Sequence, residues 1–285
     1  MELSAWFENL LFGGGKAVTA APRVVTVIGS GGKTSLIWRL AADLASKRGI
    51  LVTPTTKMLV PSPEEKLYDR YCNANSFRDD ITAGITGDPI MGITLAGVFN
   101  EAIGKLESLP LPALSQLAAN RRGGAYDLVL IEGDGSKGLP LKAWAAHEPV
   151  VPDFTALTIG VLPLWPIGKP VSESLIHRLP LFLSLTGAAA GVTLKPEHII
   201  ALITRGEDKS ESSSPGGLFA RARGKKLLFF NQVEDDEALR QAWEIAALLA
   251  PNDFHAVIAG SARLNQVYQI RKFFSRRRSI ASVKK

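Results

Sequence analysis

The sequence predicts an α/β fold with a doubly wound, mostly parallel sheet. Continuous apolar runs, typical of strands buried on both faces, occur at residues 23–28, 126–131 and 226–230. Segments with apolar residues at helical spacing separate these runs. A glycine-rich turn joins the first run to the helical segment that follows it. Strands that alternate with helices in this way favour a parallel sheet covered on both faces.

Composition limits the classes of protein that fit this chain. Its 285 residues are 46% hydrophobic, enough for a large buried core, and the net charge of +6 is concentrated in the C-terminal segment. The single cysteine, Cys72, excludes an intramolecular disulfide or a cysteine-ligated metal site and fits a cytoplasmic location. We find no signal peptide and no apolar stretch long enough to span a membrane, and we expect no nucleic-acid partner.

The first half of the chain contains a strand–loop–helix–strand unit. Apolar spacing predicts a first helix at residues 3–11, which a run of three glycines ends. Residues 23–28 (RVVTVI) predict a buried strand, residues 35–47 a helix, and residues 49–53 a second strand. Residues 61–88 are polar and rich in turn formers.

The second half continues the alternation. We expect helices at residues 114–122, 173–185, 196–203 and 235–249. We expect strands at residues 126–131, 155–161, 226–230 and 254–259.

These elements divide the chain into three parts. Residues 1–20 are expected to form an N-terminal helix and linker, residues 21–265 a P-loop NTPase-like α/β domain, and residues 266–285 a basic C-terminal tail. Within the domain, residues 205–224 are rich in serine, glycine and charge and are predicted to form a mobile loop.

The glycine-rich turn predicts a binding site for a nucleoside triphosphate. A turn that ends a strand and opens a helix directs backbone N–H groups and the positive end of the helix dipole at one point, which favours phosphate. Lys33 would supply charge to the phosphates and Thr34 a hydroxyl to Mg²⁺. Val27 stands where the standard motif has glycine, so the loop is a shorter variant like that of Mur-type ligases. The predicted nucleotide-binding residues are Gly29, Ser30, Gly31, Gly32, Lys33, Thr34 and Ser35.

Two carboxylates follow the apolar run at residues 128–131. Glu132 and Asp134 lie between glycines at the end of a predicted strand, as in a Walker-B-like segment. Such carboxylates can hold Mg²⁺ or orient an attacking water. We assign Glu132 to the metal and Asp134 to the metal or to catalysis alongside Lys33; the alternative is a turn with solvated acids.

Other polar groups follow predicted strands at the edge where α/β sheets bind ligands. Thr55, Thr56 and Lys57 follow the strand at residues 49–53 and can contact the γ-phosphate or a second substrate, or form an ordinary turn. Lys137 and Lys142 follow the acidic pair and have a similar status; both can equally be surface lysines.

Two later turns resemble the base-recognition turns of GTPases. Asn231 begins the first, but Gln232 and Glu234 replace its usual lysine and aspartate, which leaves the choice between ATP and GTP open. The second turn begins with Ser261 and Ala262. His147 and His177 adjoin apolar runs and can serve in acid–base or metal chemistry, or as hydrogen-bonded structural residues.

The phrases VIGSGGKTS, TPTTKM, LVLIEGDGSKGLPLKAW, HEPVVP, LIHRLP and LLFFNQVED occur in this order. Over residues 20–265 the chain resembles the selenium-dependent molybdenum hydroxylase accessory protein family (YqeC-like), a P-loop nucleotide-binding group. The resemblance implies an accessory role in maturation of these hydroxylases. Its implied partners are a molybdenum hydroxylase or an intermediate of the molybdenum or selenium cofactor.

Three functions fit these observations. The first is a Mg²⁺-dependent nucleoside triphosphatase, with ATP or GTP as the nucleotide, that drives a maturation step. The second is a nucleotide-gated recruitment module without appreciable turnover. The third is a small-molecule ligase or kinase, which requires a pocket for a second substrate; the candidates for it are the turn at residues 55–57 and the regions of His147 and His177.

Overall fold

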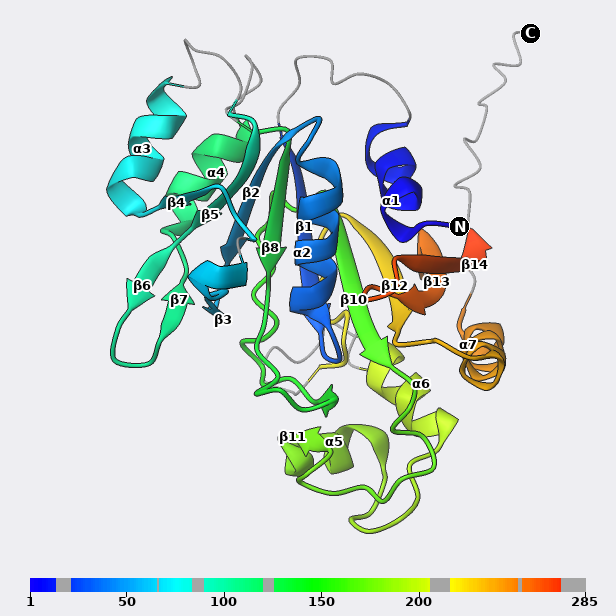
Figure 1. Cartoon of the computed structure of the whole chain (residues 1–285). Coiled ribbons are helices and arrows are strands. Elements are labelled where there is room, and N and C mark those ends of the chain that lie inside the picture. Colours follow the sequence, from blue (N-terminus) through cyan, green and yellow to red (C-terminus); the bar gives the residue numbers. More distant parts are fainter. Residues whose placement is uncertain are drawn as a thin grey trace, which may run out of the picture.

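A mostly parallel sheet forms the centre of the molecule (Figure 1). The computed structural model describes residues 1–13, 22–65, 67–83, 90–119, 126–205, 216–250 and 253–272. Within these residues the main sheet has nine strands, and only the pair β13–β14 is antiparallel. In spatial order the strands are β14 (Gln266–Lys272), β13 (Ala256–Ser261), β12 (Lys225–Asn231), β10 (Leu157–Pro163), β1 (Arg23–Gly29), β8 (Leu128–Glu132), β2 (Gly49–Pro54), β5 (Gly92–Ala96) and β4 (Arg70–Cys72).

Helices cover both faces of this sheet. One face packs against α1 (Leu3–Phe12) and α2 (Lys33–Leu44). The other face packs against α3 (Ala74–Ala83) and α4 (Leu111–Ala119) over one half, and α6 (Pro196–Thr204) and α7 (Asp236–Leu248) over the other, with α5 (Leu179–Thr186) beside α6. The predicted α/β class with a mostly parallel sheet is therefore confirmed.

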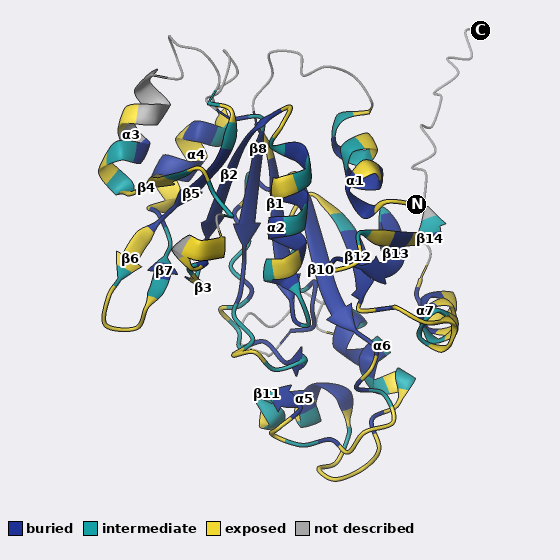
Figure 2. Ribbon diagram, viewed as in Figure 1, coloured by how far each residue is buried: buried dark blue, intermediate teal, exposed yellow. Residues whose placement is uncertain are grey.

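The alternation of side chains along β1 explains the layering. Val25 and Val27 point into the core formed with α1 and α2, whereas Val24 and Ile28 point into the cores on the opposite face. Every residue of β1 after Arg23 is buried, as expected for a central strand covered on both sides. Figure 2 shows the sheet as a buried layer between helices with exposed outer surfaces.

Two small sheets accompany the main one. The strands β9 (Leu141–Lys142) and β11 (Ile176–His177) pair in parallel. The strands β3 (Lys57–Leu59), β7 (Lys105–Glu107) and β6 (Val98–Asn100) form an antiparallel sheet, and a short 3₁₀ helix, η1 (Pro63–Glu65), follows β3. Figure 1 shows β11 and α5 beyond the carboxyl edge of the main sheet, where β8 and β10 end.

The boundaries of the domain differ from the prediction at both ends. Residues 266–272, which we assigned to the basic tail, form the edge strand β14, because Val267 and Ile270 are buried against the sheet. The N-terminal helix also belongs to the core: Leu3 and Phe7 are fully buried, and Trp6 Nε1 donates a hydrogen bond to Gln269 Oε1 at 3.0 Å. Residues 273–285 lie outside the described residues.

Several internal elements also differ from expectation. The helix expected at residues 173–185 begins only after β11, since Arg178 has a left-handed backbone with φ of 63°. The turn-rich segment at residues 61–88 contains η1, β4 and α3, and residues 84–89 are not described.

Two further segments are only partly described. Of the segment 205–224, expected to be mobile, residues 206–215 lie outside the description, whereas Leu218 and Phe219 are buried beside Gly160. The helix expected at residues 114–122 is α4, and residues 120–125 are not described. None of the helices within the described ranges is long and apolar enough to cross a membrane.

Candidate functional site

The glycine-rich loop connects β1 to α2 at the carboxyl edge of the sheet. Gly29, Gly31 and Gly32 have φ of 104°, 71° and 113°, a region that favours glycine. A Cβ on Gly29 would lie 2.2 Å from the Val161 carbonyl oxygen, and one on Gly31 2.4 Å from Pro163 Cδ. The glycines therefore allow the loop to pack against the end of β10. Because the first turn of α2 directs backbone N–H groups out of the helix, the loop has the geometry of an anion site.

Lys33, the first residue of α2, folds back onto this loop. Its Nζ donates a hydrogen bond to the Gly29 carbonyl oxygen at 2.7 Å and lies 3.4 Å from Asp134 Oδ1. The side chain is 4% exposed and contributes to the wall of a cavity in front of the loop. The lysine therefore places a positive charge beside the position that the loop offers to an anion.

Thr34 and Glu132 meet at the mouth of the loop. Thr34 Oγ1 donates to Glu132 Oε2 at 2.8 Å, because β8 is the parallel neighbour of β1 and ends at the same edge. Burial raises the pKa of Glu132; Asp134 also raises it, whereas Lys33 and Thr34 act in the opposite direction. A hydroxyl oxygen and a carboxylate oxygen are ligands that Mg²⁺ prefers. The structure thus brings together two of the three residues predicted to bind the metal.

The third predicted metal ligand, Asp134, lies behind the loop. Its carboxylate is fully buried and accepts hydrogen bonds from the Gly29 backbone N–H at 3.1 and 3.2 Å and from Trp144 Nε1 at 2.5 Å. The ammonium groups of Lys33 and Lys142 lie 3.4 and 3.3 Å from its oxygens. Both oxygens are occupied by protein donors, and Asp134 lines none of the three cavities described below. In this arrangement Asp134 holds the loop through the Gly29 N–H, and its expected role at the metal or in catalysis stays a prediction.

Lys142 extends this arrangement into a buried network of charges, which sequence reasoning missed because a lysine after a turn is usually exposed. The side chain is fully buried, donates to the Gly135 carbonyl oxygen at 2.7 Å, and lies 3.1 Å from Glu148 Oε2. Glu148 in turn forms a two-pronged ion pair with Arg178. Burial acts to raise the pKa of Glu148, but Arg178 and Lys142 together lower it to about 2.

Three cavities adjoin along the carboxyl edge of the sheet. The central cavity, here called the phosphate-side cavity, has a volume of about 710 Å³ and is lined by the glycine-rich loop, Thr34 and Glu132. It shares Trp165 and Gln232 with a base-side cavity of about 730 Å³. On the other side a lysine-rich cavity of about 560 Å³ shares residues with it, namely Lys57, Lys105, Gly135 and Lys137.

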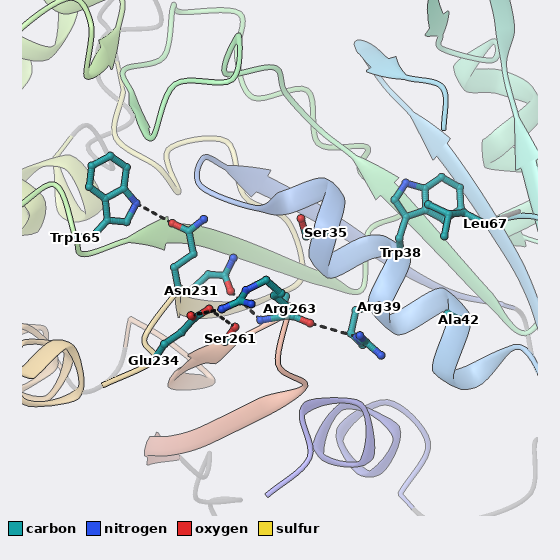
Figure 3. A pocket seen from close by; sticks show the side chains of 12 residues that line it. Ser35, Trp38, Arg39, Ala42, Leu67, Trp165, Asn231, Glu234, Ser261 and Arg263 are labelled. Carbon is teal, nitrogen blue, oxygen red and sulfur yellow. Dashed lines mark hydrogen bonds and ion pairs between the residues drawn. The ribbon is translucent and has the colours of Figure 1, made fainter. Parts of the chain in front are cut away.

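The base-side cavity contains the two turns that resemble base-recognition turns (Figure 3). Asn231 Nδ2 donates to the Gly31 carbonyl oxygen at 2.8 Å, and its Oδ1 accepts from the Ala262 backbone N–H at 3.0 Å. Asn231 therefore ties the glycine-rich loop to the second turn. Glu234 accepts from Ser261 Oγ at 2.8 Å and from Arg263 at 2.5 Å.

Apolar and aromatic side chains complete this cavity. Trp165 donates a hydrogen bond through Nε1 to Gln232 Oε1 at 2.8 Å. In Figure 3 it lies on the opposite side of the view from Trp38 and Leu67. Ser35, a predicted nucleotide contact, also lines this cavity. Ser30 does not: its Oγ is buried and, among the described residues, has no hydrogen-bond partner.

The remaining candidates divide between backbone contacts and the lysine-rich cavity. Thr55 Oγ1 donates to the Val150 carbonyl oxygen at 2.7 Å and lines none of the three cavities. Thr56 and Lys57 line the lysine-rich cavity together with His177, so two segments that are distant in sequence converge there. His147 has a side chain 77% exposed and lies outside all three cavities.

The described residues contain no group of three or more histidine, cysteine, aspartate or glutamate side chains that could hold a metal ion. A metal at Thr34 and Glu132 would therefore need further oxygen ligands. Phosphate oxygens and water usually supply these to Mg²⁺ at nucleotide sites. The donor set thus fits Mg²⁺ that arrives with a phosphate ligand.

A family model and a protein of known sequence that match this chain both point to the same family. The family model described as YqeC protein matches residues 25–180. The uncharacterized protein YqeC of Escherichia coli (strain K12) is 30% identical over 240 residues, which cover 84% of this chain and 87% of that protein. A search of solved structures gives no match. The matched family segment includes the glycine-rich loop, Glu132, Asp134 and Lys142, and the chain belongs to the YqeC family.

Proposed function

We propose that this protein binds a nucleoside triphosphate with Mg²⁺ and acts as a nucleoside triphosphatase. The observation that carries the proposal is the Thr34–Glu132 pair, which lies at the mouth of the glycine-rich loop and faces the phosphate-side cavity. The loop and Lys33 would hold the phosphates, and Thr34 and Glu132 would hold Mg²⁺. When bound, the metal ion would neutralise charge on the β- and γ-phosphates.

The arrangement of cavities supports a whole nucleotide rather than a free phosphate. The base-side cavity adjoins the loop and has aromatic walls from Trp38 and Trp165. Glu234 supplies a carboxylate acceptor that can pair with N–H groups on a base edge, while Arg263 and Ser261 fix its orientation. ATP and GTP both remain candidates, since guanine and adenine each present an N–H donor to such a carboxylate.

The family resemblance supports the biological context of the proposal. We propose that nucleotide turnover serves maturation of selenium-dependent molybdenum hydroxylases or of their cofactor. The protein would then contact a hydroxylase or a molybdenum or selenium cofactor intermediate. Nucleotide binding and the role in hydroxylase maturation are separate parts of the proposal, so each can be tested without the other.

The direct test is calorimetric titration of ATP, GTP and CTP with and without Mg²⁺. We expect Lys33→Ala to weaken binding about 10- to 100-fold, because it removes a charge-assisted hydrogen bond to phosphate. Glu132→Gln should remove most of the gain in affinity from Mg²⁺ while leaving metal-free binding within a few-fold of wild type. Lys225→Ala, an exposed lysine at the opposite edge of the sheet, is the matched control. Equal affinity of Lys33→Ala and wild type would contradict the proposal.

A further inference from the structure

The lysine-rich cavity has the size and charge of a site for a second small ligand. We propose that it binds an anionic small molecule, one that carries a carboxylate or phosphate group, beside the nucleoside triphosphate. The inference deepens the proposed function, because it places this ligand next to the phosphate-side cavity. A cavity of about 560 Å³ fits a metabolite-sized molecule rather than a protein segment.

Four cationic side chains line this cavity: Lys57, Lys105, Lys137 and Arg178. Two carboxylates also line it, but both are engaged. Glu107 lies 3.1 Å from Lys57, and this hydrogen bond is the main reason that its pKa is lowered. Glu148 pairs with Arg178 and with the buried Lys142 behind the wall. The acidic groups are therefore already neutralised.

Two lysines remain as the source of positive potential. Lys105 and Lys137 form no ion pair with any residue in the described part of the chain. Lys137 sits in a left-handed backbone conformation with φ of 53°, between the acidic strand end and Gly138. A left-handed residue other than glycine is uncommon and tends to mark a functional turn. The cavity thus carries a net positive charge that an anion can balance.

His177 adds a neutral polar group to the same wall. Its pKa is lowered by burial first, and then by the nearby charges of Arg178, Lys137 and Lys142. The imidazole is therefore uncharged at neutral pH and can donate or accept a hydrogen bond. A charged anchor together with a neutral hydrogen-bonding group is typical of sites that select a small polar ligand.

The position of the two free lysines connects this cavity to the nucleotide site. Lys105 and Lys137 line both the lysine-rich cavity and the phosphate-side cavity. An anion in one cavity and a triphosphate in the other would repel each other unless cations lay between them. These lysines occupy that position. This geometry places a second anionic ligand next to the triphosphate of the proposed function.

The test introduces a charge into the lysine-rich cavity at a residue that does not line the phosphate-side cavity. Ser108 is half-buried, lines only the lysine-rich cavity of the three, and donates to the Leu109 carbonyl oxygen at 2.6 Å. Ser108→Asp places a carboxylate there, and Ser108→Asn is the neutral control of the same shape. Citrate and inorganic phosphate serve as carboxylate and phosphate probes, and glycerol serves as an uncharged probe.

Each probe is titrated calorimetrically into three forms of the protein: nucleotide-free, bound to Mg²⁺ and a non-hydrolysable triphosphate, and nucleotide-free Lys33→Ala. We expect citrate or phosphate to bind in the lysine-rich cavity in all three forms. Ser108→Asp should weaken this binding about 10-fold or more, whereas Ser108→Asn should stay within about 3-fold of wild type. Glycerol should not bind.

The outcomes separate this inference from the proposed function. If the triphosphate fails to bind but the anions bind Lys33→Ala and are weakened by Ser108→Asp, the proposed function fails and the anion site stands. If Lys33→Ala abolishes anion binding and Ser108→Asp does not change it, the probe occupies the glycine-rich loop and the inference is overturned. Absence of anion binding to all three forms also overturns it.

Discussion

Replacing Lys142 with methionine tests whether the buried charge network holds the site together. The ammonium group is fully buried between Asp134 Oδ2 at 3.3 Å and Glu148 Oε2 at 3.1 Å. Methionine keeps most of the side-chain volume but removes the charge and the hydrogen bond to the Gly135 carbonyl oxygen. Two carboxylates then lose their shared partner in a region shielded from water.

The magnitude follows from the cost of an unpaired buried charge. Removing one partner of a buried ion pair destabilises a protein by roughly 3–5 kcal/mol. Asp134 keeps Lys33 and Glu148 keeps Arg178, so we expect the lower half of that range, about 3–4 kcal/mol. At roughly 2.1 cal/mol/K per residue, a chain of 285 residues has an unfolding entropy of about 0.6 kcal/mol/K, so the melting temperature should fall by about 5–7 °C.

Thermal unfolding followed by circular dichroism measures this change. The control is Lys47→Met, which removes a lysine that is 66% exposed and 3.5 Å from Glu8. Such surface pairs contribute less than about 1 kcal/mol, so the control should shift the melting temperature by less than about 2 °C. A Lys142→Met protein with the same melting temperature as the Lys47→Met control would refute the view that Lys142 is a buried structural cation.

Three further predictions concern the loop, the metal pair and the network. Gly29→Ala should destabilise the protein by on the order of 3 kcal/mol, because its Cβ would collide with the Val161 carbonyl oxygen and its φ of 104° is unfavourable for alanine. An unchanged midpoint of urea unfolding would contradict this prediction. Because the pKa of Glu132 is raised, the gain in nucleotide affinity from Mg²⁺ should decline on acidification before pH 4.5 is reached, and persistence of the full gain at pH 4.5 would oppose the assignment. The pKa of Glu148 is lowered to about 2, so its stabilising effect is complete above pH 4.5 and is lost as the pH falls towards 2. Glu148→Gln should therefore lower the free energy of unfolding at pH 7. Between pH 4.5 and 2.5 the free energy of unfolding should fall less steeply in this variant than in wild type. Parallel urea curves for Glu148→Gln and wild type across that range would count against the last prediction.

The central strands were predictable because their signals are local. Residues 23–28 and 226–230 are continuous apolar runs, and both become buried strands, β1 and β12. The edge strand β14 was not predictable in this way. Its outward residues are polar or basic, as expected at the edge of a sheet, and they continue into the charged C-terminal residues. Pairing with β13 and packing against α1 and α7 distinguish β14 from a solvated tail.

The candidate site shows the same division between local and distant information. Thr34 and Glu132 are 98 residues apart, but both follow from one rule: parallel neighbouring strands end at the same edge. The direction of Asp134 does not follow from that rule. Two residues beyond the strand, the chain has turned, and the carboxylate contacts the Gly29 backbone and Trp144 behind the loop. Sequence spacing alone cannot distinguish this orientation from one that faces the cavity.

The charges of the network explain how Lys33 can lie beside a buried aspartate and still be available to the nucleotide that we propose. Three cations, Lys33, Lys142 and Arg178, face two carboxylates, Asp134 and Glu148. If Lys33 turns from the Gly29 carbonyl oxygen towards a phosphate, Lys142 and Arg178 still balance the two carboxylates one to one. Trp144 and the Gly29 N–H continue to satisfy Asp134. A movement of Lys33 towards a phosphate would therefore leave Asp134 and Glu148 with cationic partners.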